Sequence, residues 1–197
     1  QAVGAVYKNK KAGSFGIGAG FSLHPLKNLH VHGDGGVVTT NNSKLYEKLL
    51  QYRNHGLINR DECGFWGINS RLDAVQAGIG NIKLKYIDKW NNRYKEIAKI
   101  YTKNLNGYVS VPIMKEHEEP VFHRFMIRHP ERAGLQAFLA DNDIETKVNY
   151  PIPLHLQPAA KDLGYKKGDF PVAEELADTI LSLPLYPELG DDQVYYV

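Results

Sequence analysis

Hydrophobic residues recur with a helical period in the middle of the chain. Apolar side chains are spaced three or four residues apart at Leu72, Val75, Ile79, Ile82, Tyr86, Trp90, Tyr94, Ile97 and Tyr101. Steps of three and four keep side chains on one face of an α-helix. The pattern predicts one helix over residues 71–105, roughly 50 Å long at the standard rise per residue. A helix of that length typically links two lobes or joins subunits.

Shorter patterns flank this helix. Residues 37–40 are typical of a strand, and the polar run that follows supplies the cap of a helix carrying Leu45, Leu49 and Tyr52 on one face. Farther along, the pattern predicts strands over 121–127 and 144–149 and a helix over 131–142. A last helix begins near Pro171, with an inward face of Ala173, Leu176, Ala177 and Ile180. We therefore divide the chain into residues 1–70, a linking helix over 71–105, and a small α+β lobe over 106–197.

Composition excludes several classes of protein. The 197 residues carry 24 Lys+Arg and 22 Asp+Glu, a net charge of +2, and 43% of them are hydrophobic, which is typical of a soluble globular chain and not of a disordered one. The balanced charge argues against a nucleic-acid partner, and no apolar run is long enough for a membrane span. A single cysteine, Cys63, allows no internal disulfide and fits a reducing cytoplasm.

Seven of the 18 glycines lie between Gly13 and Gly36, around the segment of residues 21–29, which holds one serine and one lysine. This pattern favours either a pocket built from backbone or a pair of tight turns. Three kinds of chemistry compete for the region. His30, His32 and Asp34 are possible metal ligands, but no recognised metal-binding frame surrounds them. A Ser22-based hydrolase lacks the GxSxG elbow. A Lys27 amine could act as a nucleophile toward an aldehyde, although composition alone makes it an ordinary surface charge.

A set of motifs favours the lysine. They are Phe21-Ser22-Leu23-His24-Pro25-Leu26-Lys27-Asn28-Leu29, Gly33-Asp34-Gly35-Gly36-Val37-Val38-Thr39-Thr40, Arg53-Asn54-His55-Gly56, Gly67-Ile68-Asn69-Ser70-Arg71-Leu72-Asp73, Tyr150-Pro151-Ile152-Pro153-Leu154-His155 and Leu181-Ser182-Leu183-Pro184. In this order they resemble the DegT/DnrJ/EryC1/StrS family of pyridoxal-phosphate-dependent sugar aminotransferases. The resemblance implies an α/β fold: a fragment of a fold-type I transferase of the aspartate aminotransferase kind. It would comprise the end of the large mixed-sheet domain, a long interdomain helix and a small α+β domain.

The resemblance also implies residue roles. Lys27 would hold pyridoxal 5'-phosphate as a Schiff base and move the proton, and Ser22 would hydrogen-bond the cofactor phosphate. Asn69 would reach the phosphate of the neighbouring subunit, which makes the active sites shared within a homodimer. Gln1 would lie beside the pyridine ring. Tyr150 and His155 would border the sugar, and no metal is implied.

The first residues, Gln1-Ala2-Val3-Gly4, resemble the end of the family's Asp-x-x-Gln-Ala-x-Gly motif. We therefore expect this chain to be a piece of a longer protein. The acidic residue that protonates the pyridine nitrogen and the phosphate loop would lie outside it. We expect this piece alone to be inactive.

The function that the resemblance implies is transfer of the amino group of L-glutamate to a nucleotide-linked 3-keto-6-deoxyhexose, with dTDP as the nucleotide, in deoxyaminosugar biosynthesis. Enzymes of the same family that aminate C4 or act on UDP-sugars remain alternatives, as does a non-catalytic relative that binds a sugar nucleotide. A dehydratase of this family would carry another residue in place of the lysine, commonly histidine, whereas position 27 is Lys27.

Overall fold

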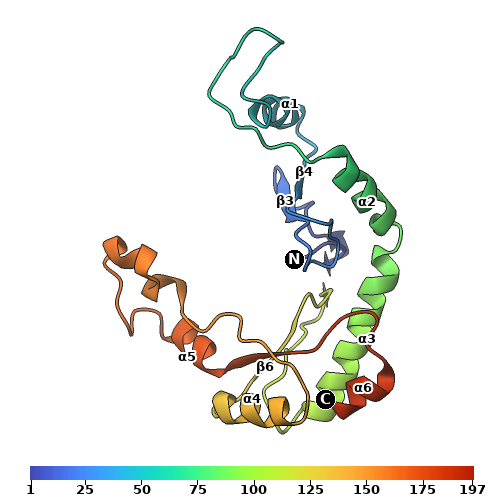
Figure 1. Ribbon diagram of the computed structural model, residues 1–197, viewed down its shortest axis with the longest axis vertical. Coiled ribbons are helices and arrows are strands. Elements are labelled where there is room, and N and C mark those ends of the chain that lie inside the picture. Colours follow the sequence, from blue (N-terminus) through green and yellow to red (C-terminus); the bar gives the residue numbers. More distant parts are fainter. The chain divides into compact units, whose positions relative to one another are not determined.

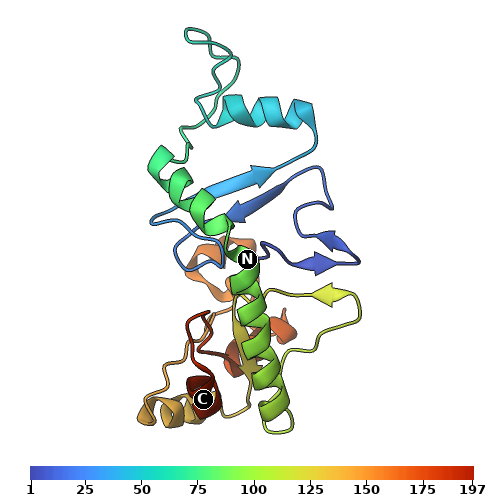
Figure 2. The ribbon, with the colours of Figure 1, turned by 90° about the vertical axis from the view of Figure 1, so that its right-hand side faces the viewer.

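The computed structural model describes residues 1–197 as two compact units. The first unit comprises residues 1–92 and 114–123, and the second comprises residues 93–113 and 124–197. Figures 1 and 2 show their elements. None of the helices is both long and apolar enough to cross a membrane.

Two small antiparallel sheets build the first unit. One has the strand order β2-β1-β5 and joins β1 (Val6–Tyr7), β2 (Lys10–Lys11) and β5 (Glu118–Glu119). The other pairs β3 (Ala19–Ser22) with β4 (Gly36–Thr39), so that Ser22 faces Gly36. The helices are α1 (Ser43–Tyr52) and α2 (Ala74–Leu84). The predicted cap of α1 is confirmed, because the Asn42 side chain accepts a hydrogen bond from the N–H of Leu45 (2.8 Å).

The core of the first unit forms around the segment that follows β3. Leu23, Leu29 and Val31 are buried with Ile87 of α3 (Ile87–Leu105), and Val3, Leu72 and Trp90 pack against them. The N–H of Val31 donates to the carbonyl of Leu23 (2.9 Å), and the N–H of Leu23 donates to that of Gly35 (2.8 Å). Residues 24–30 therefore form a closed loop whose two ends are fixed in the core.

The single helix predicted over 71–105 is wrong in one respect: it is two helices. α2 ends at Leu84 and α3 begins at Ile87. At the break the N–H of Tyr86 donates to the carbonyl of Lys83 (2.9 Å), a tighter turn than an α-helix makes. The apolar spacing continues through the break, so periodicity alone did not reveal it.

The second unit pairs β6 (Phe125–Arg128) with β7 (Ile180–Leu183) in antiparallel register, Phe125 opposite Leu183. Its helices are residues 93–105 of α3, α4 (Arg132–Asp141), α5 (Pro171–Thr179) and α6 (Asp191–Tyr196). Two short 3₁₀ segments, η1 (Leu154–Leu156) and η2 (Pro158–Leu163), precede α5. Arg93, in the first half of α3, pairs with Asp191 at the start of α6 (2.7 Å), and Figure 1 shows both helices.

The core of this unit consists of side chains from the two strands and the helices. Its largest fully buried side chains are Tyr101, Phe125, Ile97 and Leu181. The rings of Tyr101 and Phe125 pack 5.2 Å apart, and the Tyr101 hydroxyl donates to the carbonyl of Pro184 (2.9 Å). The apolar stripe of α3 thus serves here as a core face.

Three local predictions for this unit need correction. Residues 144–149 do not form the expected strand. Lys147 makes only an isolated antiparallel bridge to Ser182. The strand expected over 121–127 is shorter and shifted, at Phe125–Arg128. Ala173 is exposed, whereas Ala177 of the predicted inward face is buried. The helices over α4 and from Pro171 are confirmed.

Candidate functional site: the Lys27 loop

The lysine singled out by sequence lies on the closed loop between β3 and β4. Lys27 is half-buried, and its N–H donates to the carbonyl of His24 (2.9 Å). The Nδ1 atom of His30 lies 2.9 Å from the carbonyl oxygen of Lys27, and because that oxygen can only accept, Nδ1 donates. Both backbone polar groups of Lys27 are therefore held, while its amine is carried away from them on four methylenes.

Ser22 lies at the last position of β3, five residues before the lysine. Its hydroxyl oxygen accepts a hydrogen bond from the N–H of His24 (3.3 Å), and the Nδ1 of His24 in turn accepts one from the N–H of Leu26 (3.2 Å). The Ser22 side chain is exposed. Because its oxygen is used as an acceptor, the hydroxyl hydrogen is available to an anion such as a phosphate.

Gln1 lies near Lys27. The pKa of the Gln1 α-amino group is lowered, first by partial burial and second by the positive charge of Lys27. A charge acts this way only over a short distance. The placement of the Gln1 side chain beside the cofactor ring stays a prediction.

Asn69 lies on a different feature, the loop of residues 53–73 that extends from α1 (Figures 1 and 2). It forms an antiparallel bridge with Asn54, and Arg71 donates to both side-chain oxygens, each at 3.1 Å. Gly56 has a φ of +73°, and a Cβ there would overlap the carbonyl oxygen of Phe65. Only glycine fits this close approach.

Asn69 also lines a cavity of about 510 Å³. The other lining residues are Asp34, Gly35, Gly36, Ser70, Arg71, Leu72 and Asp73. Lys27 and Ser22 are not among its lining residues, although Gly36, the strand partner of Ser22, is one of them. Its predicted role toward a neighbouring subunit stays a prediction.

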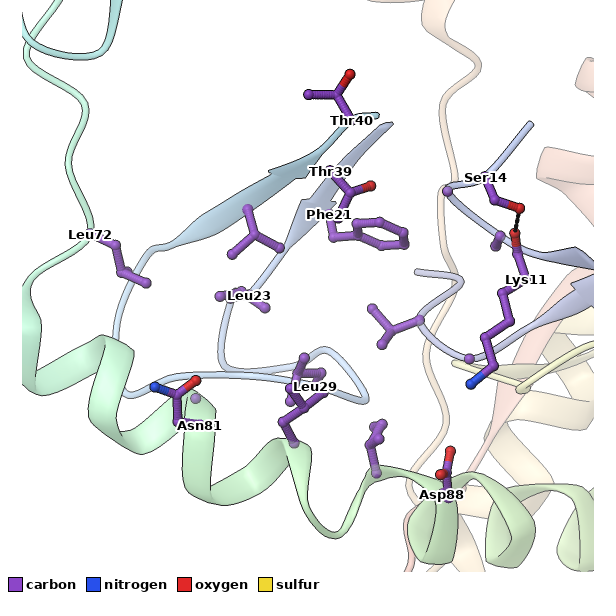
Figure 3. Close-up of a pocket in the computed structure, with 18 of the residues that line it drawn as sticks. Lys11, Ser14, Phe21, Leu23, Leu29, Thr39, Thr40, Leu72, Asn81 and Asp88 are labelled. Carbon is purple, nitrogen blue, oxygen red and sulfur yellow. Dashed lines mark hydrogen bonds between the residues drawn. The ribbon is translucent and has the colours of Figure 1, made fainter. Parts of the chain in front are cut away.

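A larger cavity of about 780 Å³ lies beneath the β3–β4 hairpin (Figure 3). Phe21, Leu23 and Leu72 point into it, and Lys11 and Asp88 are the charged side chains among its lining residues. Neither Lys27 nor Ser22 belongs to its lining. Its wall is mostly apolar, and none of the predicted site residues lines it.

Tyr150 and His155 belong to the second unit. Tyr150 is 69% exposed. The side chain of His155 is only 8% exposed, and its Nε2 lies 2.9 Å from a carboxylate oxygen of Glu174 in α5. The His155 ring also packs on Phe170, 4.7 Å between centroids. His155 therefore fastens η1 to the start of α5, and contact of either residue with a sugar remains a prediction.

Sequence patterns missed two buried polar residues beside the lysine loop. Asn28 and Asn91 are 5% and 4% exposed, and their side-chain amides are hydrogen-bonded to each other (3.0 Å). Hydropathy marks both as surface residues. The sequence gives one sign that Asn28 matters: it directly follows Lys27 in the motif of residues 21–29.

The fold and the loop together define a class of protein. A lysine whose backbone is fixed at both polar groups, with a serine hydroxyl at the end of the preceding strand, suits a covalently bound aldehyde cofactor that carries an anionic group. The comparison with known sequences agrees: the chain belongs to the DegT/DnrJ/EryC1/StrS aminotransferase family, whose model matches residues 1–197.

The alignments with individual relatives span nearly all of this chain but only about half of each relative. A "pleiotropic regulatory protein" of Geobacillus stearothermophilus is 43% identical over 201 residues, which is 100% of this chain and 54% of the relative. The dTDP-3-amino-3,6-dideoxy-alpha-D-galactopyranose transaminase of Aneurinibacillus thermoaerophilus is 41% identical over 98% of this chain and 53% of its own. This chain thus spans about half the length of these relatives.

A solved structure shows the same fold. Streptomyces venezuelae DesV, in complex with a ketimine intermediate, matches with a TM-score of 0.94 at 37% identity, over 98% of this chain and 52% of that one. The chain is therefore an α/β fragment with the fold of the sugar aminotransferases, as predicted. The family indicates pyridoxal phosphate as the cofactor. The amine of Lys27 and the hydroxyl of Ser22 have the chemistry to hold the aldehyde and the phosphate of such a cofactor, and these roles stay predictions.

Proposed function

We propose that the protein containing this chain is an aminotransferase that moves the amino group of L-glutamate to a nucleotide-linked 3-keto-6-deoxyhexose, with dTDP as the nucleotide. The observation that carries the proposal is the Lys27 loop, with its fixed backbone and neighbouring serine. Family membership supports the reaction class, and the name of the A. thermoaerophilus relative, a dTDP-3-amino sugar transaminase, supports the nucleotide and the ring position.

Each residue has a defined task in this proposal. Pyridoxal phosphate, when bound, supplies the electron sink that makes a proton next to the amino group removable. Lys27 binds the cofactor aldehyde covalently and, once displaced from it, is the base that takes and returns that proton. Ser22 donates its hydroxyl hydrogen to the cofactor phosphate.

Two further roles concern the assembly and the substrate. We propose that Asn69, on the loop that extends from α1, donates to the cofactor phosphate of a partner subunit, the role that the family resemblance implies for it. Tyr150, exposed on the second unit, is the proposed sugar contact, whereas His155 would act by holding the loop that presents it. A homodimer with shared sites follows from the Asn69 role.

The first experiment tests the lysine in the intact protein. We expect the purified protein to absorb near the wavelength of a lysine-bound pyridoxal group and to be labelled at Lys27 after borohydride reduction, as read by peptide mass spectrometry. Lys27→Ala abolishes both signals because no other amine occupies that loop. Lys44→Ala, at an exposed position of α1, is the matched control and retains them. A colourless protein with no label would overturn the enzyme assignment and favour a sugar-nucleotide-binding or regulatory relative.

The second experiment tests the substrate. The intact enzyme with glutamate and a panel of dTDP- and UDP-linked ketosugars should give a 3-amino dTDP-sugar, identified by mass spectrometry and NMR. A 4-amino product, or turnover of UDP-sugars alone, would contradict the stated substrate while leaving the aminotransferase assignment intact.

A further inference from the structure

We propose that the Asn28–Asn91 amide pair is a positioning device that sets where Lys27 lies relative to residues 1–4. The inference rests on the proposed role of Lys27. It adds two residues that do not touch the cofactor but act through the backbone on either side of it.

Asn28 holds the lysine side of this connection. The residue directly follows Lys27, and its side-chain nitrogen donates both hydrogens, one to the Oδ1 of Asn91 (3.0 Å) and one to the carbonyl of Val121 (3.1 Å). Its own Oδ1 lies 3.2 Å from the Nδ1 of His123. Asn28 is thus fixed in one orientation by three partners, and it cannot move without moving Lys27.

Asn91 holds the other side. It lies in the first turns of α3, and its side-chain nitrogen donates to the carbonyl of Val3 (2.9 Å). The chain lies so close here that a Cβ at Gly4 would be 2.6 Å from that nitrogen. Gly4 also has a φ of +87°, which favours glycine. The amide of Asn91 therefore fixes the backbone two residues after Gln1.

These contacts connect the two cofactor-facing segments through one pair of side chains. Lys27 and Gln1 belong to segments that are not hydrogen-bonded to each other by any strand. The chain of donors and acceptors runs from residue 28 to the amide of Asn91 and on to the carbonyl of Val3. Because both amides are almost fully buried, water does not compete for these bonds, and each is directional.

Two apolar side chains could fill the same volume as Asn28 and Asn91, but they would make no directional hydrogen bonds. A buried amide is costly unless it is satisfied, and here every hydrogen of the Asn28 amide has an acceptor. The arrangement therefore stabilises one placement of the loop relative to residues 1–4. A lysine amine on a flexible stem depends on such a placement of its backbone to reach an aldehyde in a fixed ring.

The test uses the intact protein and the variants Asn91→Ala and Asn28→Ala, with Asn92→Ala as the matched control. Asn92 is the next residue of α3 and is exposed. Three quantities are measured: the midpoint of thermal unfolding without cofactor, the affinity for added pyridoxal phosphate, and the pH at which the absorbance of the loaded protein changes. If the pair only stabilises the fold, the substitutions lower the unfolding midpoint and leave the pH midpoint of the absorbance change where it is in the parent protein.

For Asn91→Ala we expect about tenfold weaker cofactor binding and a shift of that absorbance midpoint by roughly half a pH unit or more. Asn28→Ala should act in the same way, and the double variant should be little worse than either alone, because both belong to one connection. Asn92→Ala should match the parent protein. The borohydride label at Lys27 should fall in the two variants at low cofactor concentration.

Two outcomes separate the failures. If Asn91→Ala and Asn28→Ala lower only the unfolding midpoint, while affinity and absorbance midpoint match the parent, the pair is structural and the positioning role is refuted. If Asn28→Ala does not fold, the Asn91→Ala result decides, because Asn91 is remote from Lys27 in sequence. If Lys27→Ala itself still gives a borohydride label elsewhere, the proposed function fails instead.

Discussion

Tyr101 illustrates how one polar atom is accommodated in the core of the second unit. Its ring is 2% exposed and packs on Phe125, while its hydroxyl donates to the carbonyl of Pro184. Burial, and then the negative charge that Tyr186 would carry, raise the pKa of Tyr101 far above its ordinary value. The hydroxyl therefore stays protonated and serves as a donor at neutral pH.

We expect Tyr101→Phe to lower the free energy of unfolding by about 1 kcal/mol, because the carbonyl of Pro184 loses its donor while the packing of the ring is kept. Urea unfolding followed by circular dichroism measures the change. Tyr108→Phe is the control, since Tyr108 is 83% exposed and its loss should have no measurable effect. Equal stability of Tyr101→Phe and the parent would show that the carbonyl finds another donor.

The sequence alone singles out individual residues best where they belong to a motif. Lys27 and Ser22 were found because their order along the chain resembles a family, and the structure adds how they are held. The partner of His155 was out of reach, because Glu174 lies 19 residues away and no local pattern pairs them. Asn28 and Asn91 were missed for the same reason: their amides meet across a separation of 63 residues.

At the scale of elements, a single carboxylate joins three segments of the second unit. Glu174, in the first turn of α5, accepts from the N–H groups of Gly168 (2.8 Å) and Phe170 (3.4 Å) and faces His155 at 2.9 Å. Burial opposes its ionisation, but the hydrogen bonds from Gly168, His155 and Phe170 outweigh it, so that the pKa of Glu174 lies below its ordinary value of 4.5. The charged form is the one that holds η1 and the turn before α5 together.

A lowered pKa fixes the direction of the pH dependence. The stabilisation from Glu174 is complete above pH 4.5 and is lost as the pH falls through the lower folded-state pKa. Glu174→Gln should therefore be less stable than the parent at neutral pH, and the two should converge in acid. The difference in unfolding temperature between the two proteins, measured at about pH 3 to 7, tests this because carboxylates titrate in the acid part of that range. If the unfolding temperatures of the parent and Glu174→Gln differ by the same amount down to about pH 3, the charge of Glu174 is not the source of the stabilisation.

Element boundaries show where local pattern stops being informative. The helices α1, α4 and α5 were predicted because each has its own cap or its own period. The break between Leu84 and Ile87 was not, since the apolar spacing runs through it. The sequence marks β7 only as part of a motif and predicts a strand over residues 144–149 instead. Long-range pairing decides which apolar run becomes a strand, and β7 pairs with β6 over more than 50 residues.

The whole molecule has a separate core in each unit, and one helix, α3, contributes residues to both. The largest exposed aromatic side chain is Trp66, 94% exposed on the loop that carries Asn69. In the proposed homodimer this loop reaches the partner's cofactor. In a mixed pair, a defect in Lys27 of one subunit and a defect in Asn69 of the other would then fall in the same active site and leave the second site intact.

We expect the inactive variants Lys27→Ala and Asn69→Ala, each prepared as the intact protein, to regain activity when their subunits are mixed and allowed to exchange. One site of the mixed dimer carries both substitutions and the other carries neither, so the recovered activity approaches one half per mixed dimer. Turnover is measured after exchange. A mixture of Lys27→Ala with Lys27→Ala bearing a tag is the control and stays inactive. No recovery despite exchange would show that Asn69 serves the active site of its own subunit, which contradicts the proposed role.

The connection between Asn28 and Asn91 has a consequence for how the protein responds to its surroundings. It is made of neutral amides and carbonyls and not of ions. Dissolved salt screens exposed ion pairs such as that of Lys147 with Glu145, but it has no charge to screen between these amides. Across wide changes in ionic strength, the loop that carries Lys27 should therefore keep its place while the protein's surface pairs loosen.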